Sequence, residues 1–261
     1  MSGCVLEVAA LTDVGRVRGF NEDTVAADKE AGIALVADGM GGHRAGAVAS
    51  SMARDILLRG MRRRRRRMPP ARAVAKTVDQ ANQAIYRVGQ EDACCRSMGT
   101  TLAMMLFHDK GVTLAHIGDS RIYRLRKGCL DQLTRDDSLV DDQVAVGLIS
   151  ADQAGSSHNR HLVTRALGVD ARVDVHVQET DVRPGDIFIA SSDGLHDIVR
   201  HDDIELIVDT LHMNLKLAAR HLVQLANDLG GFDNISVALV KAVESSPVSA
   251  GWFARLFGRR H

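Results

Sequence analysis

The chain has 261 residues, and its 33 basic and 33 acidic side chains cancel to a formal net charge of zero, which argues against a nucleic-acid binder that works by bulk positive charge. With 45% hydrophobic and 25% charged residues, the composition is that of a globular protein and excludes a disordered or fibrous chain. No hydrophobic run approaches the roughly 18 residues of a membrane span, and the acidic N-terminus does not resemble a secretory signal.

Short apolar runs predict strands, in chain order, over 33–37, 101–107, 112–117, 121–126, 129–133, 187–190 and 235–240. Apolar residues at helical spacing predict helices over 45–57, 74–88 and 215–226. Because the strands come as hairpin-like pairs and the helices are clustered, we expect an antiparallel α+β fold and not a doubly wound parallel sheet. Residues 138–168 have few apolar runs and are predicted to form a flap, an excursion from the core.

Acidic residues stand at the ends of several predicted strands. An acid at the mouth of a buried strand is costly unless a cation compensates it. Several acids at one end of a sheet would repel one another and would require a bound cation. The alternative is that the Asp-Gly pairs among them mark plain turns. The acidic residues are Glu22, Asp23, Asp38, Asp119, Asp193 and Asp233.

The ligand types indicate which cation this cluster would bind. Carboxylate and backbone oxygens without an associated Cys or His pair suit Mg²⁺ or Mn²⁺ better than Zn²⁺ or copper. Gly39, next to Asp38, lets the backbone approach closely enough for a carbonyl to bind as well. Arg18 lies four residues before Glu22, and a guanidinium can bind two phosphate oxygens. A hard-metal cluster beside an arginine suggests phosphate chemistry at two metal ions.

Six short motifs follow one another in an order that resembles the bacterial form of the metal-dependent protein phosphatase 2C family. Each motif alone is weak, but the series covers roughly residues 8–242 and is specific. The motifs are RGFNED at 18–23, DGMGGH at 38–43, GTT at 99–101, GDSR at 118–121, SDGL at 192–195 and DNIS at 233–236.

The resemblance implies a four-layer α-β-β-α sandwich, in which two antiparallel sheets are flanked by helices and the metal ions lie in a cleft at one end. It implies hydrolysis of phosphoserine and phosphothreonine on proteins by a metal-bridging water, with two or three Mn²⁺ or Mg²⁺ ions. The natural counterpart would be a serine/threonine kinase of the same bacterium. The alternatives are a non-catalytic phosphoprotein-binding module and a hydrolase of small phosphoesters.

The resemblance also implies which residues bind the metal ions. Asp38 would bridge two ions, and the carbonyl of Gly39 would bind the second. Asp193 and Asp233 would complete the first. Glu22 would act on the second ion, directly or through water, and Asp119 with Asp193 would hold a weaker third ion.

The remaining site residues would bind substrate or support the site. Arg18 would bind the substrate phosphate, Asn234 would support the water shell, and Asp23 is expected to support the cluster.

Two positions depart from the family pattern. Met40 stands where animal members carry a histidine proposed as the general acid, so the acid here has no assigned residue. His43 is close in sequence but is expected to be structural. Asp137 stands where bacterial members usually have a histidine at the start of the flap. We expect it to make the flap more negative and to alter substrate or metal preference without loss of activity.

The domain prediction is a catalytic domain over residues 1–242, followed by a spacer and a basic, aromatic tail over 243–261. Two basic features lie outside the motifs. Arg62–Arg67 is either a solvated loop or frayed helix end, or a contact for an acidic partner, a phosphopeptide or an anionic membrane. The tail, with Trp252, Phe253, Leu256 and Phe257, is either an interfacial docking segment or a tail packed back or disordered. We further expect a cytoplasmic monomer that does not bind nucleic acid.

Overall fold

The computed structural model describes residues 4–41, 44–64, 67–150, 153 and 162–244. His43, Arg65 and Arg66 of the arginine run, much of the flap between 151 and 161, and the tail from 245 lie outside the described residues. The elements are β1 Cys4–Asp13, β2 Thr24–Asp28, β3 Ile33–Ala37, β4 Gly39–Met40, α1 Ala45–Arg64, α2 Pro70–Glu91, the 3₁₀ helix η1 Ala93–Cys95, β5 Gly99–Thr100, β6 Leu102–His108, β7 Gly111–Ile117, β8 Arg121–Arg126, β9 Cys129–Gln132, α3 Leu139–Ala145, β10 His176–Thr180, β11 Ile187–Ser191, α5 Asp193–His196, α6 His201–Thr210, α7 Leu215–Asp228 and β12 Ile235–Glu244.

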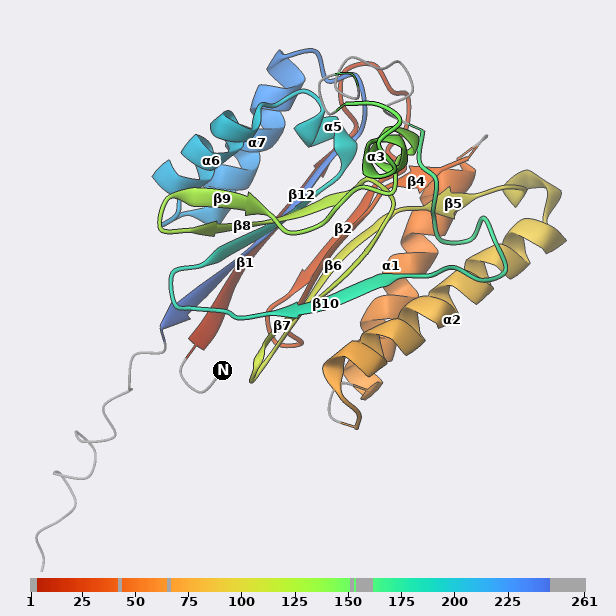
Figure 1. Ribbon diagram of the computed structural model, residues 1–261, viewed down its shortest axis with the longest axis horizontal. Coiled ribbons are helices and arrows are strands. Elements are labelled where there is room, and N and C mark those ends of the chain that lie inside the picture. The colour runs from red at the N-terminus through yellow and green to blue at the C-terminus, as the bar shows by residue number, and fades with distance from the viewer. Residues whose placement is uncertain (1–3, 42–43, 65–66, 151–152, 154–161, 245–261) are drawn as a thin grey trace, which may run out of the picture.

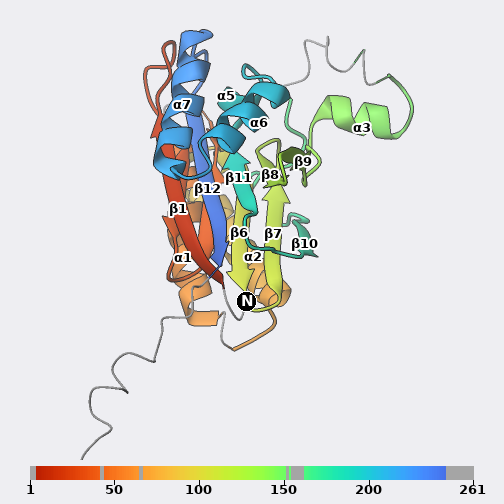
Figure 2. The ribbon, with the colours of Figure 1, turned by 90° about the vertical axis from the view of Figure 1, so that its left-hand side faces the viewer.

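Two five-stranded sheets form the centre of the molecule (Figure 1). The first has the strand order β1-β12-β11-β8-β9 and the second has the order β10-β7-β6-β3-β2. Neighbouring strands are antiparallel throughout both sheets. The view turned by 90° places β1 and β12 side by side, with α7 beside them (Figure 2).

Three hydrophobic layers hold the sandwich together. One lies between the two sheets, where the rings of Phe107 and Phe188 meet edge to face at 5.4 Å. A second packs α1 and α2 on the β3-β6-β7 sheet, and a third packs α5, α6 and α7 on the β8-β11-β12 sheet. Since β3 is covered on both faces, its run of apolar residues is buried throughout. The predicted four-layer α+β sandwich is confirmed.

Several elements carry too weak a sequence signal to be among the predicted ones. The edge strand β10 exposes His176, Gln178 and Glu179, so it has no apolar run to mark it. β1, β2, α3, α5 and α6 were likewise not expected, and α1 continues to Arg64 instead of ending near residue 57. Within the described ranges, no helix has the length and hydrophobicity to cross a bilayer.

Candidate active site

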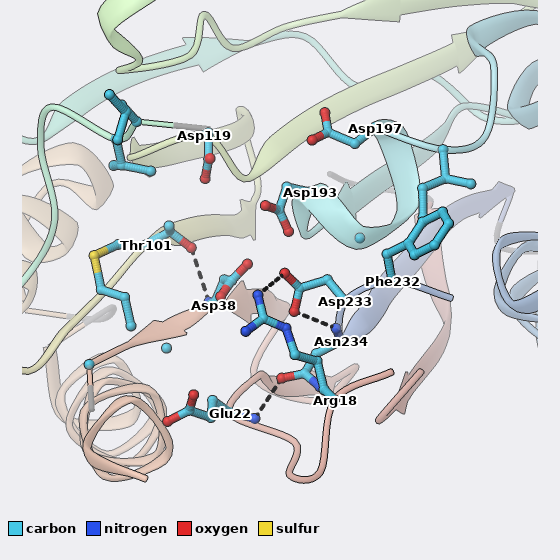
Figure 3. A pocket seen from close by; sticks show the side chains of 17 residues that line it. Arg18, Glu22, Asp38, Thr101, Asp119, Asp193, Asp197, Phe232, Asp233 and Asn234 are labelled. Atoms are coloured by element: carbon cyan, nitrogen blue, oxygen red, sulfur yellow. Dashed lines mark hydrogen bonds and ion pairs between the residues drawn. The ribbon is translucent and has the colours of Figure 1, made fainter. Parts of the chain in front are cut away.

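The acidic strand ends meet around one cleft of about 890 Å³ at one end of the sandwich. Figure 3 shows the carboxylates of Asp38, Asp193 and Asp233 facing a shared hollow, with Asp119 and Glu22 on opposite sides of it. Asp23 is the exception among the predicted site residues, because it lies behind the cleft wall. The predicted residues that line the cleft are Arg18, Glu22, Asp38, Gly39, Asp119, Asp193, Asp233 and Asn234.

The end of β3 positions Asp38. Its backbone N–H donates to Thr101 Oγ1 at 3.0 Å, and its carbonyl accepts from Thr100 Oγ1 at 2.8 Å. Gly39 follows at a point where a Cβ atom would collide with the backbone oxygens of Gly46 and Glu22. Only glycine therefore lets the start of α1 and the Glu22 loop close around Asp38.

Adjacent antiparallel strands bring Asp193 and Asp233 together. Asp193 opens α5 just after β11, and Asp233 comes just before β12, the neighbour of β11. Asn234 then ties in the loop that carries Arg18. Its Nδ2 donates to Phe20 O at 2.9 Å, and its Oδ1 accepts the N–H of Glu22 at 2.8 Å.

The crowded carboxylates have raised pKa values. Burial raises the pKa of Asp119 to about 8, with a further contribution from Asp193. Burial and then the charge of Asp233 raise the pKa of Asp193 to about 6. The pKa of Asp38 is raised well above its ordinary value by burial and by the charges of Asp23, Asp193 and Asp119. The metal-free cleft therefore retains protons that a bound cation would displace.

Asp23 lies in the wall behind Asp38. Its carboxylate accepts a hydrogen bond from Ser192 Oγ at 2.8 Å, next to Asp193. Burial raises its pKa to about 7 despite hydrogen bonds from Ser236 and Ser192 that lower it. Asp23, just before β2, is therefore linked to Ser192, just after β11.

Arg18 is the only basic residue among those that line the cleft within the described ranges. Its Nη2 donates to Asp233 Oδ2 at 2.6 Å, and this contact raises the pKa of Arg18. More than half of the Arg18 side chain is exposed. A guanidinium so placed can bind an anion that enters the cleft.

The donor set fits a hard divalent ion. Oε1 of Glu22 and Oδ1 of Asp193 are buried and have no hydrogen-bond partner among the described residues. All the acidic lining residues offer oxygen, as Mg²⁺ and Mn²⁺ require. As the described side chains stand, with Arg18 on Asp233, no three His, Cys, Asp or Glu residues are spaced to hold one ion.

The cleft also contains residues that the sequence did not single out. Asp197 lies one helical turn after Asp193, a spacing that could have indicated it. Phe232 and Leu162 line the mouth and are largely exposed, at 63% and 53%. Because they come from loops far apart in the chain, only the fold brings them together. Met40, which stands where the family pattern has a histidine in animal members, also lines the cleft.

Asp137 and its neighbour Asp136 do not line this cleft but face a second hollow. Asp136 is paired with Arg121 at 2.7 Å, and Asp137 with Arg165 at 2.7 Å. The expected gain of negative charge at the flap is therefore offset by arginine.

Comparison with known proteins agrees with this geometry. Residues 16–229 match the family model described as protein phosphatase 2C. The chain is 36% identical over 236 residues to the serine/threonine phosphatase stp of Listeria monocytogenes, covering 88% of this chain and 93% of the relative.

Solved structures show the same similarity. The serine/threonine phosphatase PstP/Ppp of Mycobacterium tuberculosis superposes with a TM-score of 0.86 at 35% identity, covering 92% of this chain and 99% of that one. The catalytic domain of PstP in complex with two manganese ions superposes with a TM-score of 0.82 at 34% identity, covering 92% and 100%.

Proposed function

This chain belongs to the protein phosphatase 2C family of serine/threonine protein phosphatases, and we propose that it hydrolyses phosphoserine and phosphothreonine in the cleft around Asp38. The observation that carries the proposal is the convergence of Asp38, Asp193 and Asp233 with Arg18 around one hollow. Separate strands supply these residues, so their meeting is a property of the fold.

Phosphatases of this family use Mn²⁺ or Mg²⁺, and the PstP catalytic domain contains two manganese ions. In this chain, we propose that Asp38 and the Gly39 carbonyl hold the ions together with Asp193, Asp233 and Glu22. Asp119 with Asp193 would hold a third ion. When bound, the ions supply the activation of water for in-line attack on phosphorus and the compensation of charge in the transition state.

The side chains around the ions have complementary tasks. Arg18 exchanges its contact with Asp233 for the substrate phosphate, which places the phosphorus over the carboxylate hollow. Asn234 keeps Arg18 and Glu22 in place by holding the backbone of their loop at Phe20 and Glu22. Asp23 supports the wall through Ser192.

A protein substrate suits this cleft better than a small phosphoester does. The cleft has a volume of about 890 Å³, which exceeds what a phosphate group needs. At the mouth of the cleft, the exposed side chains of Phe232 and Leu162 offer apolar contacts. The complete set of carboxylates likewise favours catalysis over a non-catalytic binding module.

The partners we propose are phosphorylated proteins and the serine/threonine kinase that phosphorylates them. A cytoplasmic location is consistent with the free thiols of Cys94, Cys95 and Cys129. We propose that the protein acts as a monomer, with peripheral contacts through Arg62–Arg67 or the tail.

The test is hydrolysis of a phosphothreonine peptide with Mn²⁺, with chelator, and by the Asp38→Ala and Asp193→Ala variants. We expect activity only in the wild-type protein with metal. A small phosphorylated metabolite, assayed in parallel, should be hydrolysed far more slowly. Peptide hydrolysis that survives both the chelator and the substitutions would contradict the proposal.

A further inference from the structure

The flap begins beside a second hollow of about 530 Å³, which is separate from the catalytic cleft. Asp137, His116, Arg165 and His176 are among the residues that line it. None of these four lines the cleft, and none has a role in the proposed reaction. Asp137 is nevertheless 97% buried, and a buried carboxylate requires partners.

The carboxylate and the backbone N–H of Asp137 make four polar contacts. Its Oδ1 accepts from Arg165 Nη1 at 2.7 Å and forms a hydrogen bond with His176 Nε2 at 3.0 Å. Its Oδ2 accepts the backbone N–H of Gly118 at 3.1 Å. Its own backbone N–H donates to Gly118 O at 2.7 Å. The carboxylate therefore joins the turn at Gly118 to Arg165 and His176.

Arg165 and Asp137 come from the two ends of the flap. Backbone hydrogen bonds already join these ends, from Thr164 N–H to Asp137 O at 2.8 Å and from Leu139 N–H to Leu162 O at 2.9 Å. Leu162 and Val163, within the same returning segment, line the catalytic cleft. The ion pair thus fixes a segment that forms part of the cleft wall.

Gly118 immediately precedes Asp119, the carboxylate proposed for the third ion. Its φ of 93° places it in the left-handed region, and a Cβ there would lie 2.7 Å from Thr101 Cγ2. Ser120 on the other side of Asp119 forms a hydrogen bond with Thr101, with 2.6 Å between the two hydroxyl oxygens. The turn is therefore packed between Thr101 and Asp137.

His116 adds no full charge to the group of residues around Asp137. Its ring stacks on that of His176 with 5.8 Å between the centroids. Burial lowers the pKa of His116 to about 4, so this ring is neutral near pH 7. Arg165, whose guanidinium is always charged, therefore supplies a permanent positive charge against Asp137.

We propose that Asp137 is a positioning residue that links both ends of the flap to the Gly118–Asp119 turn and so fixes where Asp119 stands in the cleft. The inference rests on the proposed role of Asp119 in metal binding. A neutral histidine at this position has one acceptor nitrogen and could not accept hydrogen bonds from Gly118 and Arg165 together. The linkage therefore depends on a carboxylate at position 137.

The test uses Asp137→Asn and Arg165→Ala, with Arg165→Lys as the conservative variant. Asparagine presents an N–H to Arg165 or to Gly118, so one of the two contacts is lost. We expect apparent Mn²⁺ affinity, measured by titration calorimetry, to fall about tenfold in Asp137→Asn and Arg165→Ala, the lower end of the cost of losing a partner behind a metal ligand. Arg165→Lys should retain part of the Mn²⁺ affinity that Arg165→Ala loses. Amide hydrogen exchange at residues 117–121 of the metal-free protein should rise in parallel.

The matched control is Asp186→Asn. Asp186 is as buried as Asp137, at 2% exposed, and is paired with Arg126 at 2.7 Å, but it does not line the cleft. This variant should lose stability without a change in Mn²⁺ affinity or in exchange at 117–121.

Two results would overturn the proposal. One is that Asp137→Asn matches Asp186→Asn in both measurements. The other concerns the variant that carries both Asp137→Asn and Arg165→Ala. If its loss of Mn²⁺ affinity equals the sum of the two single losses in free energy, the residues are not linked, since linked residues should not be additive. Because the exchange measurement needs neither metal nor substrate, it reports on the linkage even if the proposed function is wrong.

Discussion

Asp38, Asp119 and Asp193 are carboxyl groups that folding removes from water and places near one another, so that their charged forms are disfavoured. Such an arrangement is unfavourable in the metal-free chain and favourable once divalent cations are bound, because the cations replace both the protons and the lost hydration. The same three residues should therefore determine how stability responds to pH and to metal.

We expect metal-free protein to lose stability as the pH rises. Between its unfolded and its folded pKa, a carboxyl with a raised pKa is protonated in the folded chain but ionised in the unfolded chain. Its contribution to folding stability is therefore fully present only at low pH. That contribution is lost from about pH 4 upward, through the pKa of about 6 for Asp193 and about 8 for Asp119. Mn²⁺ competes with these protons, so the rise in Tm on adding Mn²⁺ should be larger at pH 8 than below pH 6.

Thermal melting with Mn²⁺ and with chelator at both pH values measures this difference. Asp119→Asn serves as the control, because it removes the carboxyl with the pKa of about 8 and should reduce the pH dependence. A metal-induced shift in Tm that is equal at both pH values would contradict the explanation.

At this scale the sequence could predict the acidic residues but not their surroundings. Asp38 and Asp193 were predictable because each follows a run of buried strand residues, where an acid is conspicuous. Phe232 and Leu162 were not, since nothing local distinguishes an exposed apolar loop residue from one that faces a cleft. The pairing of Asp137 with Arg165 depends on a contact between the two ends of the flap, which local patterns do not encode.

Among the elements, α1 connects the cleft to the arginine run. Its first turn packs against Gly39, and the helix ends at Arg64. Its last turn carries three arginines, whose positive charges interact favourably with the negative end of the helix dipole. With 20 residues the helix is about 30 Å long. The described arginines therefore lie far from the cleft around Asp38, and Arg62 is paired with Asp28 at 2.7 Å.

Replacing Arg62–Arg67 with glutamine should leave hydrolysis of a small aryl phosphate unchanged. The distance along α1 excludes a direct contact with the reacting phosphate. Arg18→Ala, the contrasting variant, should lower kcat/KM at least tenfold, because a hydrogen bond to a charged group contributes about 1.5–3 kcal/mol. A comparable loss in the glutamine variant would show that the run acts within the catalytic core.

Element prediction succeeded for strands buried on both faces and for the edge strand β9, which follows β8 through a short turn. It failed for the other three edge strands, β1, β2 and β10. β3 and β6 are continuous apolar runs because a sheet and a helical layer enclose them. β10 is polar because it pairs only with β7 and lies at the sheet edge. α5 has four residues, too few for helical periodicity to be detected.

At the scale of the whole molecule, the two sheets and their helical layers are complete by Glu244. β12 pairs with β1 on one side and with β11 on the other, and its last pair joins Glu244 to Cys4. We therefore propose that the catalytic unit does not need the residues that follow.

Deleting residues 245–261 should leave Tm and phosphopeptide hydrolysis unchanged. If the tail is a docking segment, the deletion should also reduce co-sedimentation with vesicles that contain anionic lipid. A variant in which Trp252, Phe253 and Phe257 are replaced by serine keeps the length and basic charge and isolates the aromatic contribution. Equal sedimentation of all three proteins would exclude membrane docking by the tail.

The central place of β12 in its sheet has a consequence for biosynthesis. This strand fills the space between β1, made first, and β11, and it follows directly on Asp233 and Asn234. A chain still emerging from the ribosome lacks the strand that joins these neighbours, so its sheet stays split and its cleft lacks a wall. The catalytic cleft can form only after β12 has been translated, so a chain truncated before residue 235 should be inert.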